Sequence, residues 1–144
     1  IMGIHDMIVH DYGPGRVFVT VHAEIPYEMD MLKAHDIIDM AEHKVSQKFH
    51  CGITIHMDPV VTDDASINEL KNVSQQVIQN IDPQISMHDF RVVTGPHRTN
   101  LIFDIVIPFG YKIPDEVLKK KIRDDIFAVK DNCYANITID KSYF

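Results

Sequence analysis

The chain has 144 residues, of which 45% are hydrophobic and 24% are charged, a composition typical of an ordinary globular protein. Its net charge of −7 would repel phosphate backbones, so we expect no nucleic-acid partner. The apolar runs are far shorter than the about 20 residues that a membrane-spanning helix needs. The two cysteines, Cys51 and Cys133, form no CxxC motif, which argues against a disulfide framework or a thiolate metal site.

Four landmarks occur twice along the chain, in the same order and 82 to 84 residues apart. They are His5-Asp6 with His88-Asp89, Gly13-Pro14 with Gly95-Pro96, Ile25-Pro26 with Ile107-Pro108, and Ile53-Thr54-Ile55 with Ile137-Thr138-Ile139. Two copies are too few for a solenoid, which needs at least about three stacked units. The landmarks therefore predict two tandem copies of one small domain, residues 1–64 and 65–144, with the boundary at Thr62 to Ala65.

The first copy begins with a predicted β-hairpin. Residues 7–9 are an apolar strand, and a turn-rich segment at 11–15 joins them to residues 17–25, where apolar and polar side chains alternate. Apolar residues at three- and four-residue steps from Asp30 to Phe49 indicate an amphipathic helix with Asp30 as its N-cap. Alternation over residues 53–58 predicts a third strand.

The second copy opens with a predicted helix that Pro83 ends, and Ser66 and Glu69 mark its start with the spacing of a capping box. Strands over 87–93 and 101–107, a helix over 114–129 and a strand over 135–140 follow. We therefore expect an α/β fold of the α+β kind, with two tandem open ferredoxin-like sandwiches, each (α)ββαβ. Because the first copy lacks the leading helix and the chain begins at Ile1, we expect it to be part of a longer protein.

Histidine is the residue type that points to chemistry, because the chain has nine and the neutral imidazole is the commonest metal ligand. On the strand alternation His22 faces away from the apolar side, and His56 and Asp58 share the outward face of their own strand. His5 lies at the start of the first hairpin. Three neighbouring strands could thus bring imidazole nitrogens and a carboxylate oxygen to one divalent ion.

On the predicted helix, His35, Asp39 and His43 are spaced four residues apart and form one polar ridge. That ridge could face the strand histidines or a second protomer, and its spacing permits a ligand without requiring one. His10, His50 and His97 are interpreted as surface residues.

The second copy has fewer ligand-type residues. His88 is kept, while the positions matched to His22 and His56 by the landmarks hold Asp104 and Asp140. These residues could form a weaker metal site, but we favour the interpretation that this copy is degenerate and kept for packing.

Four segments together resemble the cytosolic domain of the cation diffusion facilitators, and the resemblance covers residues 3 to 59. They are Gly3-Ile4-His5-Asp6, Val21-His22, Lys33-Ala34-His35 and Ile55-His56-Met57-Asp58-Pro59. In that family a transmembrane half exports zinc or a related divalent ion by proton antiport, and the cytosolic half dimerises and binds metal.

The resemblance implies a metal-binding, dimerising regulatory domain on the cytoplasmic face of the cell membrane, with no catalytic role. Its ligands are expected to be His5, His22, His35, His56 and Asp58. Zinc is the first expectation for the ion, with Mn, Fe, Co and Ni as alternatives. The expected partners are a second copy of the chain and the N-terminal transmembrane half of the same protein.

Three other function classes stay open at this point. A zinc hydrolase would use the same cluster with an open water position, but no separate general base or oxyanion donor is evident. A small-molecule regulatory module would bind at contacts between the copies, although no phosphate-cradling glycine loop is present. A soluble metallochaperone is disfavoured because the CxxC expected of a copper carrier is missing.

Overall fold

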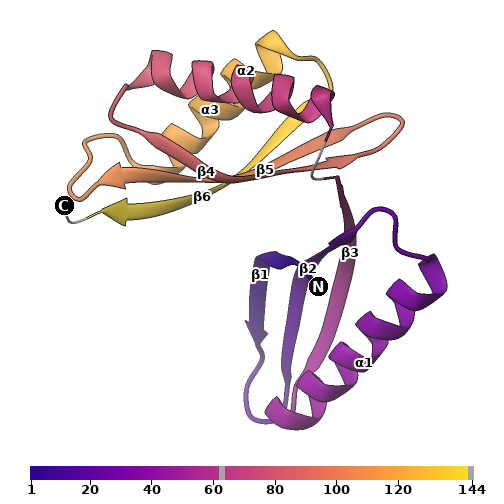
Figure 1. Ribbon diagram of the computed structural model, residues 1–144. Helices are drawn as coiled ribbons and strands as arrows, with labels where there is room; N and C mark the ends of the chain where they lie inside the picture. Colours follow the sequence, from indigo (N-terminus) through magenta and orange to yellow (C-terminus); the bar gives the residue numbers. More distant parts are fainter. Residues whose placement is uncertain (62–63, 143–144) are drawn as a thin grey trace. The chain divides into compact units, whose positions relative to one another are not determined.

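The computed structural model of the protein describes residues 1–61 and 64–142, and the chain divides into two compact units, Ile1–Val60 and Val61–Phe144 (Figure 1). Each is described by itself. The predicted boundary at Thr62 to Ala65 lies partly outside the described residues. No helix in the described part of the chain is long and apolar enough to cross a membrane.

The first unit has the order β1, β2, α1, β3. Strand β1 (Gly3–Asp11) pairs antiparallel with β2 (Val17–Pro26), and β2 pairs parallel with β3 (Gly52–Val61). Helix α1 (Met31–Phe49) is the crossover that the parallel pair requires. The β1–β2 ladder shifts register between His5 and Ile8, so β1 carries a bulge beside the first histidine.

Helix α1 forms for the reasons that its sequence indicates. The side chain of Asp30 accepts a hydrogen bond from the backbone nitrogen of Lys33 at 3.1 Å, which confirms the predicted N-cap. The stripe of the helix contributes Ala34 and Ile38 to the interior, and the buried side chains of β2 are the odd-numbered Val21, Ala23 and Ile25, together with Glu24. Successive strand side chains point to opposite faces, so the even-numbered face of the sheet is turned away from the α1 stripe.

The second unit has the order α2, β4, β5, α3, β6. Strand β4 (Ser86–Thr94) pairs antiparallel with β5 (Thr99–Pro108), and β5 pairs parallel with β6 (Cys133–Ser142). Helices α2 (Ala65–Ile81) and α3 (Asp115–Val129) lie on the same side of this sheet (Figure 1). Its core includes fully buried side chains from β5 and α3, namely Leu101, Phe103, Ile105, Ile107, Leu118, Ile122 and Ile126.

The α+β fold class is thus confirmed, and the predicted elements are present with somewhat longer strands. One expectation about a helix start was wrong. Ser66 does not cap α2, because Asp64 occupies the N-cap position and accepts a hydrogen bond from the backbone nitrogen of Ser66 at 3.2 Å. Asp64, two residues before Ser66, caps the free amide groups at the start of the helix instead.

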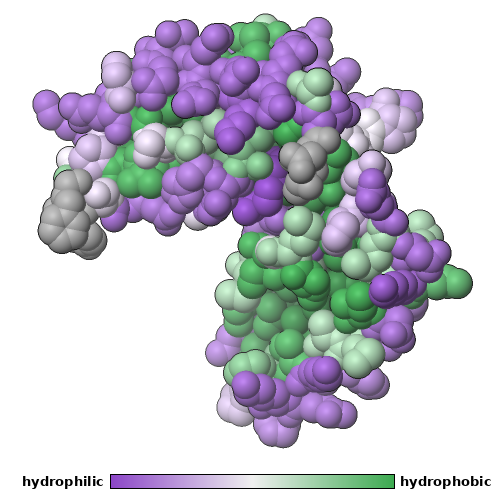
Figure 2. Space-filling view, viewed as in Figure 1, coloured by the Kyte–Doolittle hydropathy of each residue, from purple (hydrophilic) through white to green (hydrophobic). Residues whose placement is uncertain are grey.

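Large hydrophobic side chains remain exposed on the first unit, and Figure 2 shows hydrophobic residues gathered on the face of this unit that is in view. They include Ile4, Met7, Ile8, Val9, Phe18, Met31 and Leu32, each more than half exposed. A face on which hydrophobic side chains gather is typical of an interaction site.

Candidate metal centre

Three adjacent strands carry one histidine each at the same level of the sheet. In the ladders His5 is paired with His22, and His22 is paired with His56. The ring centroids of His5 and His22 lie 5.1 Å apart, and those of His22 and His56 lie 4.7 Å apart. The strand register therefore places three imidazoles in one row, as the alternation pattern predicts.

Asp58 lies at the centre of this row. Its Oδ2 is 3.0 Å from Nε2 of His5 and 3.0 Å from Nδ1 of His22. Its Oδ1 is 3.2 Å from Nε2 of His56. The side chains of Asp58 and His5 are only 9% and 8% exposed, whereas those of His22 and His56 are 38% and 66% exposed, so the row is buried at one end and open to solvent at the other.

Glu24 fixes the orientation of the buried ring. It lies on the same face of β2 as His22, and its Oε1 accepts a hydrogen bond from Nδ1 of His5 at 3.1 Å. A carboxylate on one ring nitrogen orients the other nitrogen toward a metal and increases its basicity. Gly3 leaves room for this carboxylate, because a Cβ at that position would lie 2.9 Å from Oε2 of Glu24.

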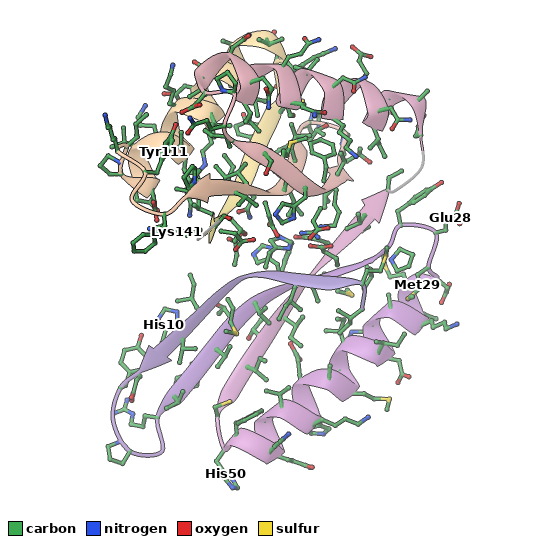
Figure 3. The ribbon with its side chains drawn as sticks, turned by 60° about the vertical axis from the view of Figure 1, so that its left-hand side comes forward. His10, Glu28, Met29, His50, Tyr111 and Lys141 are labelled. Atoms are coloured by element: carbon green, nitrogen blue, oxygen red, sulfur yellow. The ribbon has the colours of Figure 1, made fainter. Side chains whose placement is uncertain are left out.

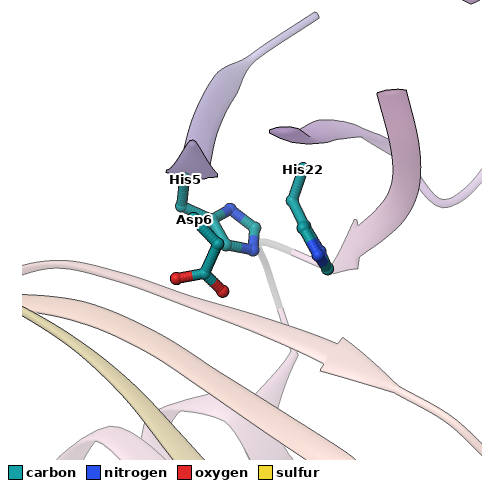
Figure 4. A group of neighbouring side chains, drawn as sticks. All are labelled: His5, Asp6 and His22. Atoms are coloured by element: carbon teal, nitrogen blue, oxygen red, sulfur yellow. The ribbon is translucent and has the colours of Figure 1, made fainter. Parts of the chain in front are cut away.

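Asp6 is a further ligand-type residue of this centre, since one carboxylate oxygen and one nitrogen each of His5 and His22 lie within 4.8 Å of one another (Figure 4). Its φ of 50° is left-handed, a region in which Asp is enriched among non-glycine residues. Sequence reasoning missed both Asp6 and Glu24 as site residues. The repeated His-Asp landmark could have indicated Asp6, and the two-residue step from His22 could have indicated Glu24.

The electrostatics of the row couple the imidazoles to the carboxylates. Burial alone would lower the pKa of His5, but the hydrogen bonds and charges of its acidic neighbours, with Asp58 first, outweigh burial and raise that pKa above 6.5. Burial would raise the pKa of Asp58, but hydrogen bonds from His5 and His22 lower it below 3.8. The raised pKa of His5 and the lowered pKa of Asp58 both favour an ion pair between the imidazolium and the carboxylate.

The structure brings together four of the five predicted ligands, while the fifth, His35, is exposed on α1. No group of neighbouring ligand-type atoms among residues 1–61 and 64–142 includes His35. The surface interpretation of other histidines agrees with their exposure: His10 and His50 lie near the far ends of β1 and α1 (Figure 3), and His97 is in the β4–β5 turn.

The donor set fits a divalent ion of intermediate softness. Three imidazoles and one carboxylate are the ligand types that zinc accepts in tetrahedral sites, and the 3.0 to 3.2 Å contacts to Asp58 already place the donors around one small volume. Asp6 could supply a further oxygen to a larger coordination shell.

The strand registers also correct one correspondence between the two units. The landmarks match His56 with Asp140, but His22 is paired with His56, whereas Asp104 is paired with Thr138. If Asp104 corresponds to His22, Thr138 is the counterpart of His56, and Asp140 is that of Asp58. The landmark match is displaced by two residues because an Ile-Thr-Ile triplet occurs later in β6 than in β3.

The segment that contains the candidate metal centre is similar to known proteins. Residues 1–60 match the family model described as the cation efflux protein, cytoplasmic domain. Residues 1–60 are therefore similar to the cytoplasmic domain of cation efflux proteins, and we call this segment the cation efflux domain. This cation efflux domain contains all five predicted ligands together with Asp6 and Glu24.

Curated relatives agree with the family match. The cation-efflux pump FieF of Salmonella typhimurium and that of Salmonella enteritidis are each 32% identical to this chain over 60 residues. The aligned segment is 41% of this chain and 20% of each pump, so the similarity covers about a fifth of the length of these relatives. The resemblance inferred from the sequence motifs is thus supported for the cation efflux domain.

Proposed function

We propose that the chain is the regulatory, dimerising part of a divalent-cation efflux transporter and that it binds metal through His5, His22, His56 and Asp58. The observation that carries this proposal is the position of Asp58, whose two oxygens lie within 3.2 Å of imidazoles from three different strands. Zinc is the first candidate for the ion, with Mn, Fe, Co and Ni as alternatives, because three nitrogen donors favour the borderline metals.

His35 enters this proposal through a second copy of the chain. The row of imidazoles is on the face that carries the even-numbered residues of β2 and β3, and the apolar stripe of α1 covers the opposite face, so His35 is badly placed to reach the row of its own chain. A partner in a homodimer could present its own His35 to the open end of the row, where His56 is 66% exposed.

Two properties of the cation efflux domain support dimerisation that depends on metal. Exposed hydrophobic residues such as Ile4 and Phe18 offer surface for an interface. Two chains that each carry a net charge of −7 repel one another, and a divalent ion held near their contact offsets that repulsion. Metal binding would thereby fix the angle between the protomers.

The transporter context gives the binding a role. Attached to a transmembrane half at the cytoplasmic face of the membrane, a metal-dependent change in dimer geometry needs a coupling free energy of only about 1–3 kcal/mol to alter transport severalfold. The transporter would then sense the concentration of the metal ion that it exports, without a covalent step.

Mass measurement in solution tests the proposal. We expect zinc to shift the full 144-residue chain from monomer toward dimer, and we expect His22→Ala and His35→Ala to weaken that shift. His97→Ala, in an exposed turn, serves as the matched control and should behave like the unmodified chain. An equal dimer fraction with zinc and with chelator, or an equal loss in all three variants, would refute the proposal.

A further inference from the structure

We propose that the second unit holds its own metal site, formed by His88, Asp104 and Asp140 with Asp89 beside them, and that this site prefers Mn²⁺ to zinc. The proposal goes beyond the proposed function, because the family match ends at residue 60 and the second site lies wholly in the unit that begins at Val61.

The two units place these residues at equivalent positions. His88 is paired with Asp104 across the β4–β5 ladder just as His5 is paired with His22, and the register shifts after His88 as it does after His5. Asp89, the residue that follows, has a φ of 52°, as Asp6 has one of 50° in the first unit. The hairpin geometry around the candidate site is therefore the same in both units.

The side chains of His88, Asp89, Asp104 and Asp140 lie close to one another. One ligand atom each of His88, Asp89 and Asp104 lie within 4.8 Å of one another. Nε2 of His88 is 3.7 Å from Oδ2 of Asp140, and its Nδ1 is 3.4 Å from Oδ2 of Asp89. Ligands on opposite sides of an ion bound at about 2.1–2.4 Å are roughly 4.2–4.8 Å apart, so one ion fits among the grouped atoms of His88, Asp89 and Asp104 after small rotations, with Asp140 next to the same imidazole.

The donor atoms of the second unit suit a different ion from those of the first unit. By the strand register, Asp104 replaces His22 and Thr138 replaces His56, while Asp140 keeps the carboxylate of Asp58. Imidazole nitrogens thus fall from three in the first unit to one in the second, and carboxylate oxygens provide the other donors. Carboxylates suit Mg²⁺, Ca²⁺ and Mn²⁺, whereas imidazoles suit zinc and its neighbours. The single imidazole of His88 favours Mn²⁺ among the oxygen-binding ions.

Exposure of the cluster is consistent with an ion that keeps several waters. The side chains of His88, Asp89 and Asp140 are 42%, 63% and 56% exposed. Water can therefore complete an octahedral shell around an ion held by three or four protein donors. A chain with both sites would respond to two kinds of metal through two related but chemically distinct units.

Electron paramagnetic resonance of Mn²⁺ with the full chain tests this proposal, because binding diminishes the sharp six-line signal of the free ion. We expect Asp104→Asn to weaken Mn²⁺ binding by about tenfold or more, since one charged ligand is lost. The same chemical replacement at an exposed position of α1, Asp39→Asn, should leave Mn²⁺ binding unchanged.

A second variant tests the selectivity independently of any loss of binding. Asp104→His restores the donor of the first unit, so we expect the ratio of zinc to Mn²⁺ affinity in the second unit to rise by about tenfold or more, measured in the His22→Ala background. The proposal is overturned if the chain binds no Mn²⁺ at millimolar concentration, if His22→Ala abolishes Mn²⁺ binding while Asp104→Asn does not, or if Asp104→His leaves the ratio unchanged. None of these results bears on zinc binding by His22 and Asp58, so the two proposals fail separately.

Discussion

Replacing Asp58 by asparagine isolates the charge of the carboxylate that three imidazoles share. The substitution keeps the shape of the side chain and removes one negative charge from a group that is 9% exposed. In the proposed zinc complex Asp58 supplies the oxygen ligand, and a hydrogen bond or ligand contact to a charged group contributes about 1.5–3 kcal/mol. We therefore expect the zinc affinity of Asp58→Asn to fall by roughly 10- to 150-fold.

Titration calorimetry at pH 7.5 measures this change, and Asp39→Asn is the matched control. Asp39 undergoes the same chemical replacement at an exposed position of α1 and should leave the affinity unchanged. The reasoning is refuted if Asp58→Asn binds zinc as tightly as the unmodified chain, or if Asp39→Asn loses as much affinity. Thermal melts of both metal-free variants show whether either one fails to fold.

Three further outcomes are expected. Without metal, the ion pair of His5 should stabilise the fold fully below pH 6.5, and this stabilisation is lost as the pH rises through the raised pKa of His5. The carboxylate of Asp58 should stabilise the fold fully above pH 3.8, and this stabilisation is lost as the pH falls through the lowered pKa of Asp58. Thermal melts of the unmodified chain and of Asp58→Asn from pH 3 to 9 test both effects. Gly3→Ala should push Glu24 off its contact and lower zinc affinity up to about tenfold in calorimetry. Ile122→Ala should cost about 2–5 kcal/mol in urea melts without changing zinc affinity in the first unit.

Much of the fold could be predicted because local rules and packing agree in most elements. The apolar stripe of α1 and its cap at Asp30 both indicate a helix, and the alternation in β2 indicates a strand. The start of α2 could not be decided in this way, since Asp64 and Ser66 are both good capping residues and only the geometry shows which carboxylate or hydroxyl reaches a free amide.

The candidate site was predictable to the extent that it follows strand parity. His22, His56 and Asp58 share a face because each alternates with the apolar residues of its own strand, and that alternation is visible in the sequence. The role of Asp6 depends on a bulge with a left-handed residue, which no periodicity displays. Glu24 follows the visible alternation of β2, but its contact with His5 depends on the room left by Gly3.

The displaced correspondence in the last strand has a consequence for how the second unit is interpreted. Under the landmark match, Asp140 replaces a histidine and no counterpart of Asp58 is evident, so the unit looks like a copy that has lost its ligands. Under the strand register, the carboxylate of Asp58 is retained as Asp140 and His5 is retained as His88. Two retained positions with oxygen donors added at Asp104 describe a changed ligand preference better than decay. The ladder register, which a search for similar triplets cannot provide, therefore favours the proposed metal-binding role of the second unit over a role in packing alone.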